Sequence, residues 1–539
     1  MEYNNSSRRI LFPLIAAGII ILGILIGISL DRADVRNRLQ NFVSPGAAPA
    51  TDKLEDMLSL IRTQYVDDVE MDSIAEKVIP VLLENLDPHS VYIPAAELAQ
   101  VNEPLEGQFD GIGVTFNMIT DTVLILNVIP GGPSARAGLL NGDRIITVDD
   151  SVIAGRNVDQ NRVVKMLRGQ RGSKVRLGIR RNGVEELVPV TVTRGIIPVK
   201  SIDAALLLAP ETGYIKLSRF SRNSHAELLE AVERLSSEGM EKLIFDLRGN
   251  SGGFLDQAIL IANEFLPEGK LTVYTEGKAQ RRREQRSDGR GTLREMPVAV
   301  LIDEGSASAS EIVAGALQDN DRGTIVGRRS FGKGLVQEQI PFTDGSAVRL
   351  TVARYYTPVG RSIQKPYDRG IEAYYGDLEN RFLHSELFSA DSIRFPDSLR
   401  FATPAGKIVY GGGGIMPDVF VPIDTARLTP YMQQVLGRNI LLYYTFDYSD
   451  KHREALNAIR TPEQLEAYFR QAGDLTDDFL RYTAARGIVP GKAEKRVSGP
   501  LLEAELKAHI GKNTSLEDNA FYLYIHPEDN VIKKTLEIF

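Results

Sequence analysis

A serine-rich turn and a glycine-flanked lysine are the parts of this sequence whose residue types and spacing suit chemistry. The apolar stretch Val298–Ile302 predicts a strand, which runs into a Ser/Gly/Ala turn and then the helical pattern Glu311–Leu317. Ser308 stands at that junction, where unpaired backbone N–H groups and the positive end of a helix dipole favour a developing oxyanion. Lys333 lies beyond a second predicted strand, Thr324–Gly327, in a turn where its stem can be desolvated. The pattern therefore suggests a nucleophile and its base.

A lysine can serve as a base only if it loses its proton near neutral pH. The ordinary lysine pKa is about 10.4, and burial among apolar groups near a helix N-terminus can lower that pKa by several units. Gln337, four residues after Lys333, can hold the amine without adding a charge. None of the six histidines stands in a nucleophile-like context, and the lack of cysteine excludes a cysteine protease and a thiolate zinc site.

The serine also has a purely structural interpretation. Ser308-x-x-Glu311 is the pattern of a capping box, in which the serine caps the helix and the glutamate reaches back to it. The flanking residues Ser306 and Ser310 suit packing or turn positions better than chemistry. The capping and catalytic interpretations do not exclude each other, so both are carried forward.

Three short motifs at fixed offsets give the sequence a family resemblance. They are SASASEI at 306–312, FGKG at 331–334 and VQ at 336–337. These residues resemble the carboxyl-terminal processing, or tail-specific, serine peptidases, which carry a PDZ domain and use a serine–lysine pair. The resemblance covers roughly residues 86–422. It implies that Ser308 is the nucleophile, Lys333 the general base, Gln337 the residue that orients the lysine, and Glu311 a supporting residue.

A glycine-rich loop follows the apolar stretch Leu243–Leu247. Because glycine has no Cβ, such a loop can bring backbone N–H groups close to a substrate. The family resemblance places oxyanion-hole donors in this loop and just after the nucleophile. It therefore implies Gly252, with its neighbour Gly253 as the weaker candidate, and Ala309 as the donors.

The same loop admits a competing interpretation. Residues 249–253 read GNSGG, the nucleophile motif of trypsin-like proteases, in which Ser251 would be the nucleophile. That fold requires a histidine and an aspartate upstream in their own contexts, and its PDZ domain would follow the protease. Here the PDZ-like stretch comes first, and His89 lies in LDPHS, which matches a structural motif of the tail-specific family. The tail-specific interpretation is therefore preferred.

Residues 108–195 resemble a PDZ domain. The segment Gly111, Ile112, Gly113 and Val114 opens a predicted strand, and its backbone N–H groups are expected to bind a substrate's terminal carboxylate while the strand pairs with the peptide. The expected partners are proteins or peptides with free, apolar C-termini. A phosphate-binding glycine loop is the alternative, but the next glycine is missing and no βαβ pattern follows.

The N-terminus predicts a membrane anchor. Ile10–Leu30 is a run of 21 residues without charge, preceded by Arg8 and Arg9. At about 1.5 Å per residue such a helix spans a hydrocarbon core of about 30 Å. A cleavable signal peptide would have a shorter apolar core and a small-x-small site, which ISLDRAD does not offer. We therefore expect residues 1–30 to be a single-pass signal anchor in the inner membrane, with the catalytic part on the periplasmic side.

The remaining segments complete a multidomain α/β prediction. A linker at 31–51 precedes a helical region at 52–107, which in the family can pair subunits, so a homo-oligomer stays open. The protease core at 196–425 is expected, from the resemblance, to be a crotonase-like β/α superhelix with the PDZ domain inserted ahead of it. An insertion near 365–407 is best interpreted as a solvated loop, with a lid or a dimer contact as alternatives. Residues 426–539 predict a helical accessory domain, for example from the Thr461-Pro462 helix start.

Composition excludes several function classes. The chain has 539 residues with 63 basic and 71 acidic side chains, a net charge of −8, and no basic stripe that would suggest nucleic acid. No metal, nucleotide or organic cofactor is implied. The expectation is a membrane-anchored serine endopeptidase that cleaves exported proteins near their C-termini. The non-enzymatic alternative is a PDZ scaffold with a degenerate protease fold, but such a protein need not keep the full set Ser308, Lys333 and Gln337.

Overall fold

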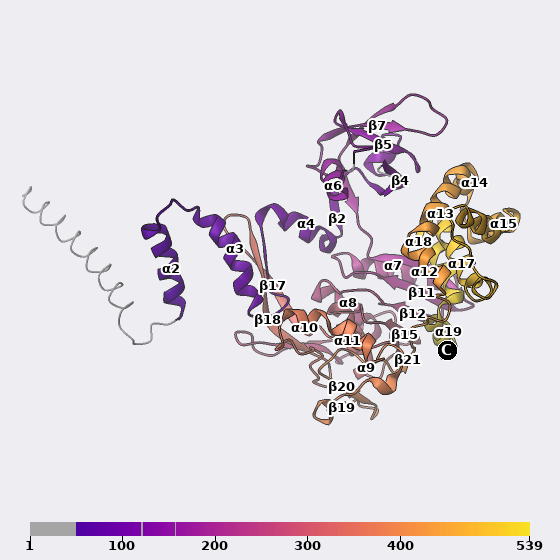
Figure 1. Ribbon diagram of the computed structural model, residues 1–539. Helices are drawn as coiled ribbons and strands as arrows, with labels where there is room; N and C mark the ends of the chain where they lie inside the picture. The colour runs from indigo at the N-terminus through magenta and orange to yellow at the C-terminus, as the bar shows by residue number, and fades with distance from the viewer. Residues whose placement is uncertain (1–49, 120–121, 157) are drawn as a thin grey trace, which may run out of the picture. The chain divides into compact units, whose positions relative to one another are not determined.

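The computed structural model describes residues 50–119, 122–156 and 158–539 (Figure 1). The chain divides into two compact units, of which the first ends at Val81 and the second begins at Leu82. The predicted anchor at 10–30 lies outside the described residues, as does the predicted linker up to residue 49. In the part of the chain that is described, no helix is long and apolar enough to cross a membrane.

The region predicted to be helical at 52–107 contains helices and one strand. Its helices are α2 (Ala50–Gln64), α3 (Met71–Glu84) and α4 (Ala95–Glu106). Between α3 and α4, the strand β1 (Val91–Ile93) pairs antiparallel with β18 (Ala347–Tyr356) of the predicted protease core. A strand of three residues is too short for hydrophobic periodicity to reveal, so the sequence did not predict it.

The predicted PDZ domain is an antiparallel sheet, and one short two-stranded ribbon lies at the point where the chain enters and leaves it. The ribbon pairs β2 (Gln108–Gly111) with β9 (Gly195–Pro198), so the chain enters and leaves the domain at the same place (Figure 1). The sheet follows the order β3-β4-β5-β7-β8, and the strand β6 pairs with β5. Its strands and helices are β3 (Val114–Ile119), β4 (Thr122–Val128), α5 (Pro133–Arg136), β5 (Arg144–Val148), β6 (Ser151–Val152), α6 (Gln160–Leu167), β7 (Lys174–Arg180) and β8 (Val188–Thr193).

The predicted protease core is built on a mostly parallel sheet in the order β10-β11-β12-β15-β16-β21. Only β10 and β11 pair antiparallel, and the following strands run parallel. The central strands read as continuous apolar runs because helices or other segments cover both faces. The strands are β10 (Ile202–Ala209), β11 (Thr212–Leu217), β12 (Lys242–Asp246), β15 (Val298–Ile302), β16 (Thr324–Gly327) and β21 (Val419–Phe420).

One face of this sheet packs against the helices α7 (Ser224–Ser237), α8 (Leu255–Phe265) and α9 (Ala309–Asp319). A second sheet in the order β1-β18-β13-β14, with β17 (Leu335–Pro341) paired to β18, stands beside it. Its other strands are β13 (Leu271–Glu276) and β14 (Arg283–Arg286). The strands β15 and β16 confirm the two strands predicted around the serine turn. The crotonase-like superhelix stays a prediction.

The C-terminal region confirms the helical prediction. Thr461 caps α15 and Pro462 is its first residue, as the sequence predicts. A core of its own joins most of these helices. The elements are α12 (Pro430–Gly437), α13 (Ile440–Lys451), α14 (Arg453–Ala458), α15 (Pro462–Gln471), α16 (Leu475–Ala484), α17 (Lys492–Lys512), α18 (Glu517–Ile525), the 3₁₀ turn η3 (His526–Glu528) and α19 (Asn530–Leu536).

The last residues of the chain belong structurally to the predicted protease core. Val531 and Ile532 of α19 pack with Tyr214, Ile244 and Leu301 on the sheet face opposite α7–α9. The end of the predicted accessory domain thus covers the second face of this sheet. The physical reason is that the inner strands of a parallel sheet must be covered on both faces.

Candidate active site

Ser308 forms the N-cap of α9, directly after the turn that leaves β15. Its backbone has φ 56° and ψ −113°, a conformation that L-residues adopt only where surrounding contacts impose it. Its hydroxyl makes no capping hydrogen bond to the helix, and the residue lines a pocket. Backbone strain of this kind gathers at active sites, and here it coincides with the residue predicted to be the nucleophile.

The two neighbouring serines tie the nucleophile turn to the glycine-rich loop. Ser306 Oγ donates to the carbonyl of Leu247 at 2.8 Å, and Ser310 Oγ donates to the carbonyl of Asn250 at 2.8 Å. Both side chains are fully buried. The prediction that Ser306 and Ser310 are structural is therefore confirmed, and their bonds hold two candidate oxyanion segments against each other.

Glu311 joins the serine turn to the lysine turn. Its Oε2 accepts the backbone N–H of Ser308 at 2.8 Å and that of Lys333 at 2.9 Å. Its Oε1 accepts from Ser330 Oγ at 2.6 Å and from Gly332 N at 2.7 Å. Burial raises the pKa of Glu311 to about 7, although these four donors favour the carboxylate. The predicted reach of the glutamate back to Ser308 is confirmed, and the same carboxylate also holds the lysine segment.

Lys333 is hydrogen-bonded to Gln337, the residue that the family resemblance implies as its partner. Lys333 Nζ donates to Gln337 Oε1 at 3.0 Å. Gln337 Nε2 in turn donates to the backbone carbonyl of His89, which fixes which way the amide points. Asp87 shapes the His89 segment because its Oδ1 accepts the N–H groups of His89 at 2.8 Å and Ser90 at 2.9 Å. The LDPHS segment is thus a support for the lysine's partner.

The electrostatic surroundings of Lys333 favour its neutral form. Burial, together with the nearby Arg349 guanidinium, lowers the pKa of Lys333 to about 8, although the carboxylates of Asp87 and Glu311 oppose the shift. Burial likewise lowers the pKa of His89 to about 4, so its imidazole adds no charge beside the lysine at neutral pH. A substantial share of Lys333 is therefore unprotonated slightly above neutral pH.

The two candidate oxyanion donors lie close together, but the backbone N–H of Gly252 already has an acceptor. A Cβ on Gly252 would come within 2.8 Å of Ser308 Cβ and 3.0 Å of Ala309 N, so the glycine allows a close approach that no other residue permits. The N–H of Gly252 donates to Asn250 Oδ1 at 2.9 Å. Ala309 is the first residue of α9, where backbone N–H groups lack helical acceptors. The assignment of Gly252 and Ala309 stays a prediction, and Gly252 must share or release its bond to Asn250.

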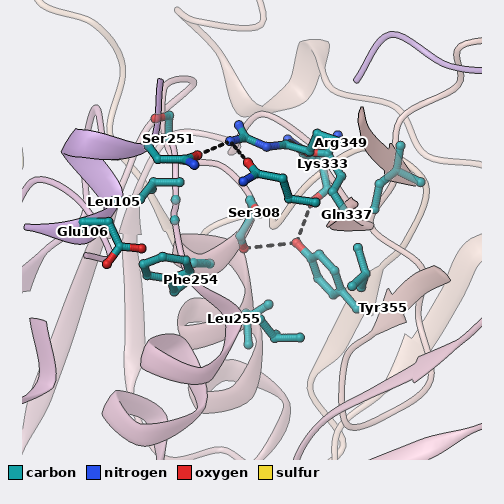
Figure 2. Close-up of a pocket in the computed structure, with 18 residues that line it drawn as sticks. Leu105, Glu106, Ser251, Phe254, Leu255, Ser308, Lys333, Gln337, Arg349 and Tyr355 are labelled. Carbon is teal, nitrogen blue, oxygen red and sulfur yellow. Dashed lines mark hydrogen bonds between the residues drawn. The ribbon is translucent and has the colours of Figure 1, made fainter. Parts of the chain in front are cut away.

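These residues surround a pocket of about 400 Å³ (Figure 2). Ser308 and Lys333 both line it, and no hydrogen bond among the described residues joins their side chains. Tyr355 links their segments from below, since its hydroxyl donates to the carbonyls of Ser308 at 3.1 Å and Lys333 at 2.6 Å. Tyr355 lies in a strand-like run and carries no motif, so the sequence analysis missed it. The apolar lining comes from Leu105, Phe254, Leu255, Ile312, Leu335 and Val336.

The insertion at 365–407 is ordered and supports the lysine segment. Arg381 is only 3% exposed and donates to the carbonyls of Ser330 at 2.8 Å and Phe331 at 3.1 Å. Tyr374 places its hydroxyl 2.8 Å from Nε2 of His89. The prediction of a solvated loop is therefore wrong. The charged and aromatic side chains that suggested an exposed loop include residues that are buried and form hydrogen bonds with other segments. Its elements are α10 (Ile371–Tyr375), α11 (Asp377–Leu383), the 3₁₀ turns η1 (Ala390–Ser392) and η2 (Asp397–Leu399), β19 (Arg400–Ala402) and β20 (Ile408–Tyr410).

Comparison with known proteins places this site in a family. The model of peptidase family S41 matches residues 211–373, which include the glycine-rich loop, Ser308, Lys333 and Gln337. A carboxy-terminal-processing protease of Bartonella bacilliformis is 38% identical over 314 residues, which are 57% of this chain and 71% of that protein. The chain belongs to peptidase family S41. It is therefore a serine peptidase of the carboxy-terminal processing kind, and the trypsin-like interpretation of Ser251 is excluded.

Further similarities reach beyond the S41 region. The carboxy-terminal processing protease CtpB of Bacillus subtilis is 32% identical over 378 residues, 67% of this chain and 76% of that protein. A solved photosystem II D1 C-terminal processing protease is similar at 26% identity, covers 70% of this chain and 90% of its own, and has a TM-score of 0.36. Residues 431–514 match a family of unknown function. Among the described residues, no cluster of three His, Asp or Glu side chains could hold a metal ion.

The S41 peptidase carries its PDZ domain where the sequence predicts it, since a PDZ model matches residues 111–192. This match also excludes the phosphate-loop alternative. The carbonyls of Ile112 and Gly113 accept bonds from Ser134 N at 2.9 Å and Ile129 N at 3.1 Å. Gly113 has φ +78°, and a Cβ there would come within 2.9 Å of Ile197 Cδ1. The next strand, β3, stands at the edge of its sheet. The carboxylate role of Gly111, Ile112, Gly113 and Val114 stays a prediction.

Proposed function

We propose that this S41 peptidase is a membrane-anchored serine endopeptidase that cleaves exported proteins near their C-termini with a Ser308–Lys333 dyad. The observation that carries the proposal is the lysine of lowered pKa, held by Gln337 in the pocket that Ser308 also lines. A base with a pKa near the working pH is the most effective proton acceptor, because it is both available and basic.

The proposed reaction begins when neutral Lys333 Nζ takes the proton of Ser308 Oγ as that oxygen attacks the substrate carbonyl. The tetrahedral oxyanion is stabilised by backbone N–H groups of Ala309 and Gly252, at the positive end of α9. Lys333 then returns the proton to the leaving amine, and the acyl-enzyme forms. Lys333 Nζ then deprotonates a water molecule, which attacks the acyl group. The acyl bond to Ser308 breaks, and the proton on Lys333 returns to Ser308 Oγ.

Gln337 and Glu311 are positioning residues in this scheme. The amide of Gln337 holds the Lys333 amine without a charge that would raise its pKa. Glu311 keeps the serine and lysine segments at a fixed separation. The apolar pocket wall, which includes Phe254 and Leu335, suits an apolar substrate side chain beside the scissile bond.

Recruitment of the substrate is proposed to use the PDZ domain. The open edge of β3 suits strand addition by a peptide, with its terminal carboxylate at Gly111–Val114. The anchor is proposed to be Ile10–Leu30 in the inner membrane, with the peptidase on the periplasmic side. Carbonate extraction and protease accessibility of the full-length chain in membrane vesicles test that part. Pairing of subunits through the region 52–107 is a further part of the proposal, and sedimentation of the full chain tests it.

The dyad is tested by incubating the peptidase with an unfolded protein and mapping the new termini by mass spectrometry. Ser308→Ala and Lys333→Ala should each abolish cleavage, and the double variant should be no worse, because the two residues act as a unit. Ser251→Ala is the matched control and should cleave, since it tests the serine of the competing motif. Cleavage by Ser308→Ala with an inactive Ser251→Ala would overturn the assignment, and an inactive wild type would favour the peptide-binding scaffold.

A further inference from the structure

The catalytic pocket holds two charged side chains besides Lys333, and only one of them has a counter-ion. They are Glu106 of α4 and Arg349 of β18, which Figure 2 shows on different sides of Ser308. Glu106 accepts two bonds from Arg222, at 2.7 Å and 2.8 Å, so its charge is matched. Among the ion pairs of the described residues, none includes Arg349, whose charge the protein therefore leaves unmatched at the pocket.

Neutral amides hold Arg349 in place. Its Nη2 donates to Asn102 Oδ1 at 3.1 Å and to Gln339 Oε1 at 3.0 Å. Both partners line the same pocket. The residue is half-buried, and burial lowers the pKa of Arg349 with no acidic group opposing the shift. A half-buried cation held by neutral groups costs free energy that an incoming anion recovers.

The guanidinium is well suited to a carboxylate. It presents five N–H donors in a planar fork, and the bonds to the two amides use only those on Nη2. The remaining donors on Nε and Nη1 can each donate to a carboxylate oxygen, and such charge-assisted hydrogen bonds are stronger than those to a neutral amide. A hydrophobic or neutral amide substrate group would leave the charge unmatched, so the site discriminates by charge.

The strand register places Arg349 a short distance from the reacting bond. Arg349 is opposite Gln339 in the β17–β18 pair, and Gln339 is two residues beyond Gln337, the partner of Lys333. Two residues of an antiparallel strand span about 7 Å. Because an extended substrate advances about 3.3 Å per residue, a group two or three residues from the scissile bond is within reach of the guanidinium.

We propose that Arg349 binds a carboxylate of the substrate two or three residues from the scissile bond, and so determines where the chain is cut. This inference rests on the proposed function, because it takes Ser308 as the point of cleavage. Two sources supply the same chemistry: an Asp or Glu side chain, and the free terminal carboxylate of a short C-terminal tail. The experiment separates them.

The first measurement compares matched peptides cleaved by the full-length peptidase. Each peptide has neutral residues around one apolar cleavage site and an amidated C-terminus, and Gln is replaced by Glu at one position at a time. At one position, two or three residues from the cut, the Glu peptide should have a kcat/KM at least about tenfold above its Gln isostere. A second pair, with the C-terminus two or three residues beyond the cut, compares the free acid with the amide.

The variants tie any preference to Arg349. Arg349→Met should reduce the Glu/Gln or acid/amide ratio to about one, and Arg349→Lys should keep part of it, since it retains the charge without the fork. Arg349→Glu should instead favour a Lys peptide over its Gln isostere. Arg354→Met is the matched control, because Arg354 is an exposed arginine of the same strand that bonds to Tyr367. It should keep the wild-type ratio.

Each ratio is measured within one variant, so a general loss of activity or stability does not change it. If only the Glu peptide is preferred, the ligand of Arg349 is an acidic side chain. If only the free acid is preferred, the ligand is the terminal carboxylate. No carboxylate preference in the wild type, or a preference that survives Arg349→Met, would overturn the inference. Ser308→Ala is assayed on the same peptides, because cleavage by that variant would refute the dyad instead, whatever Arg349 does.

Discussion

The carboxylate of Glu311 accepts the backbone N–H of Lys333 at 2.9 Å, although the two residues are 22 positions apart in the sequence. The same oxygen accepts the N–H of Ser308. A single buried atom therefore sets the separation of the proposed nucleophile and base. Catalytic geometry tolerates only small displacements, so this relationship makes strong predictions about activity as well as stability.

Glu311→Gln should lower both kcat and stability. The amide has one acceptor oxygen, so its NH₂ group must face some of the four donors that the carboxylate now accepts. Leaving a buried donor unsatisfied costs about 1–3 kcal/mol. We expect denaturant unfolding to show a free energy of unfolding lower by at least this amount. In the folded variant, kcat should fall tenfold or more. The exposed Glu338→Gln is the control, and a Glu311→Gln enzyme of normal kcat would show that the link is not needed.

The pH profile should reveal the lysine. Lys333 has its pKa lowered to about 8 and acts when neutral, so kcat/KM should rise with pH and level off above about pH 8. Lys333→Arg should be inactive across this range, because guanidinium keeps its proton. The groups that bias Lys333 are Arg349, which favours the neutral form, and Asp87 and Glu311, which favour the charged form. Appreciable turnover by Lys333→Arg would show that lysine is not the base.

Gln337→Glu should move that profile in a known direction. The substitution places a carboxylate where an amide oxygen now lies 3.0 Å from Lys333 Nζ. A close opposite charge favours the ammonium form, so the pKa of Lys333 should rise by about one to three units. The rise of kcat/KM should shift to higher pH by that amount. An unshifted profile would mean that Gln337 does not contact the working form of the base.

Amidation of a substrate's C-terminus tests the PDZ domain. It removes the terminal charge and leaves the sequence intact. Charge-assisted hydrogen bonds are worth roughly 1.5–3 kcal/mol, so cleavage of a long substrate should fall by at least about tenfold. Gly113→Glu should reduce the difference between free and amidated substrates, with circular dichroism as a check of folding because φ at Gly113 is +78°. Equal cleavage of both substrates by the wild type would remove the PDZ domain from recognition.

Arg381→Met tests the insertion as a support of the lysine segment. Arg381 donates to the carbonyls of Ser330 and Phe331, and its loss leaves these groups without those bonds in a buried site. We expect a stability loss of about 2–4 kcal/mol and a lower kcat with little change in KM. Arg369→Met, at an exposed position of the same insertion, should behave like the wild type. If Arg381→Met were as stable as the wild type, the insertion would not be needed to support the lysine segment.

The site was predictable where its signals are local. Ser308, Lys333 and Gln337 are found from motifs at short offsets, and the strands Val298–Ile302 and Thr324–Gly327 are found from apolar runs with turn residues at their ends. The helix that follows Ser308 was predicted for the same reason, because its periodicity and its cap are properties of neighbouring residues. Such elements can be predicted because each depends on the backbone geometry of residues that are neighbours in the sequence.

The sequence by itself therefore determined the candidate residues of the site, and the tertiary structure decided which contacts hold them. Arg381 belongs to an insertion whose charged and aromatic composition suggests solvent, yet it is buried because carbonyls of the lysine turn need donors. Val531 and Ile532 end the chain on the protease sheet because its second face must be covered. Arg349 is in a strand pattern like any other, and only the pairing of β17 with β18 brings its unmatched charge to the catalytic pocket. These contacts join segments far apart in the chain, and no short-range pattern encodes them.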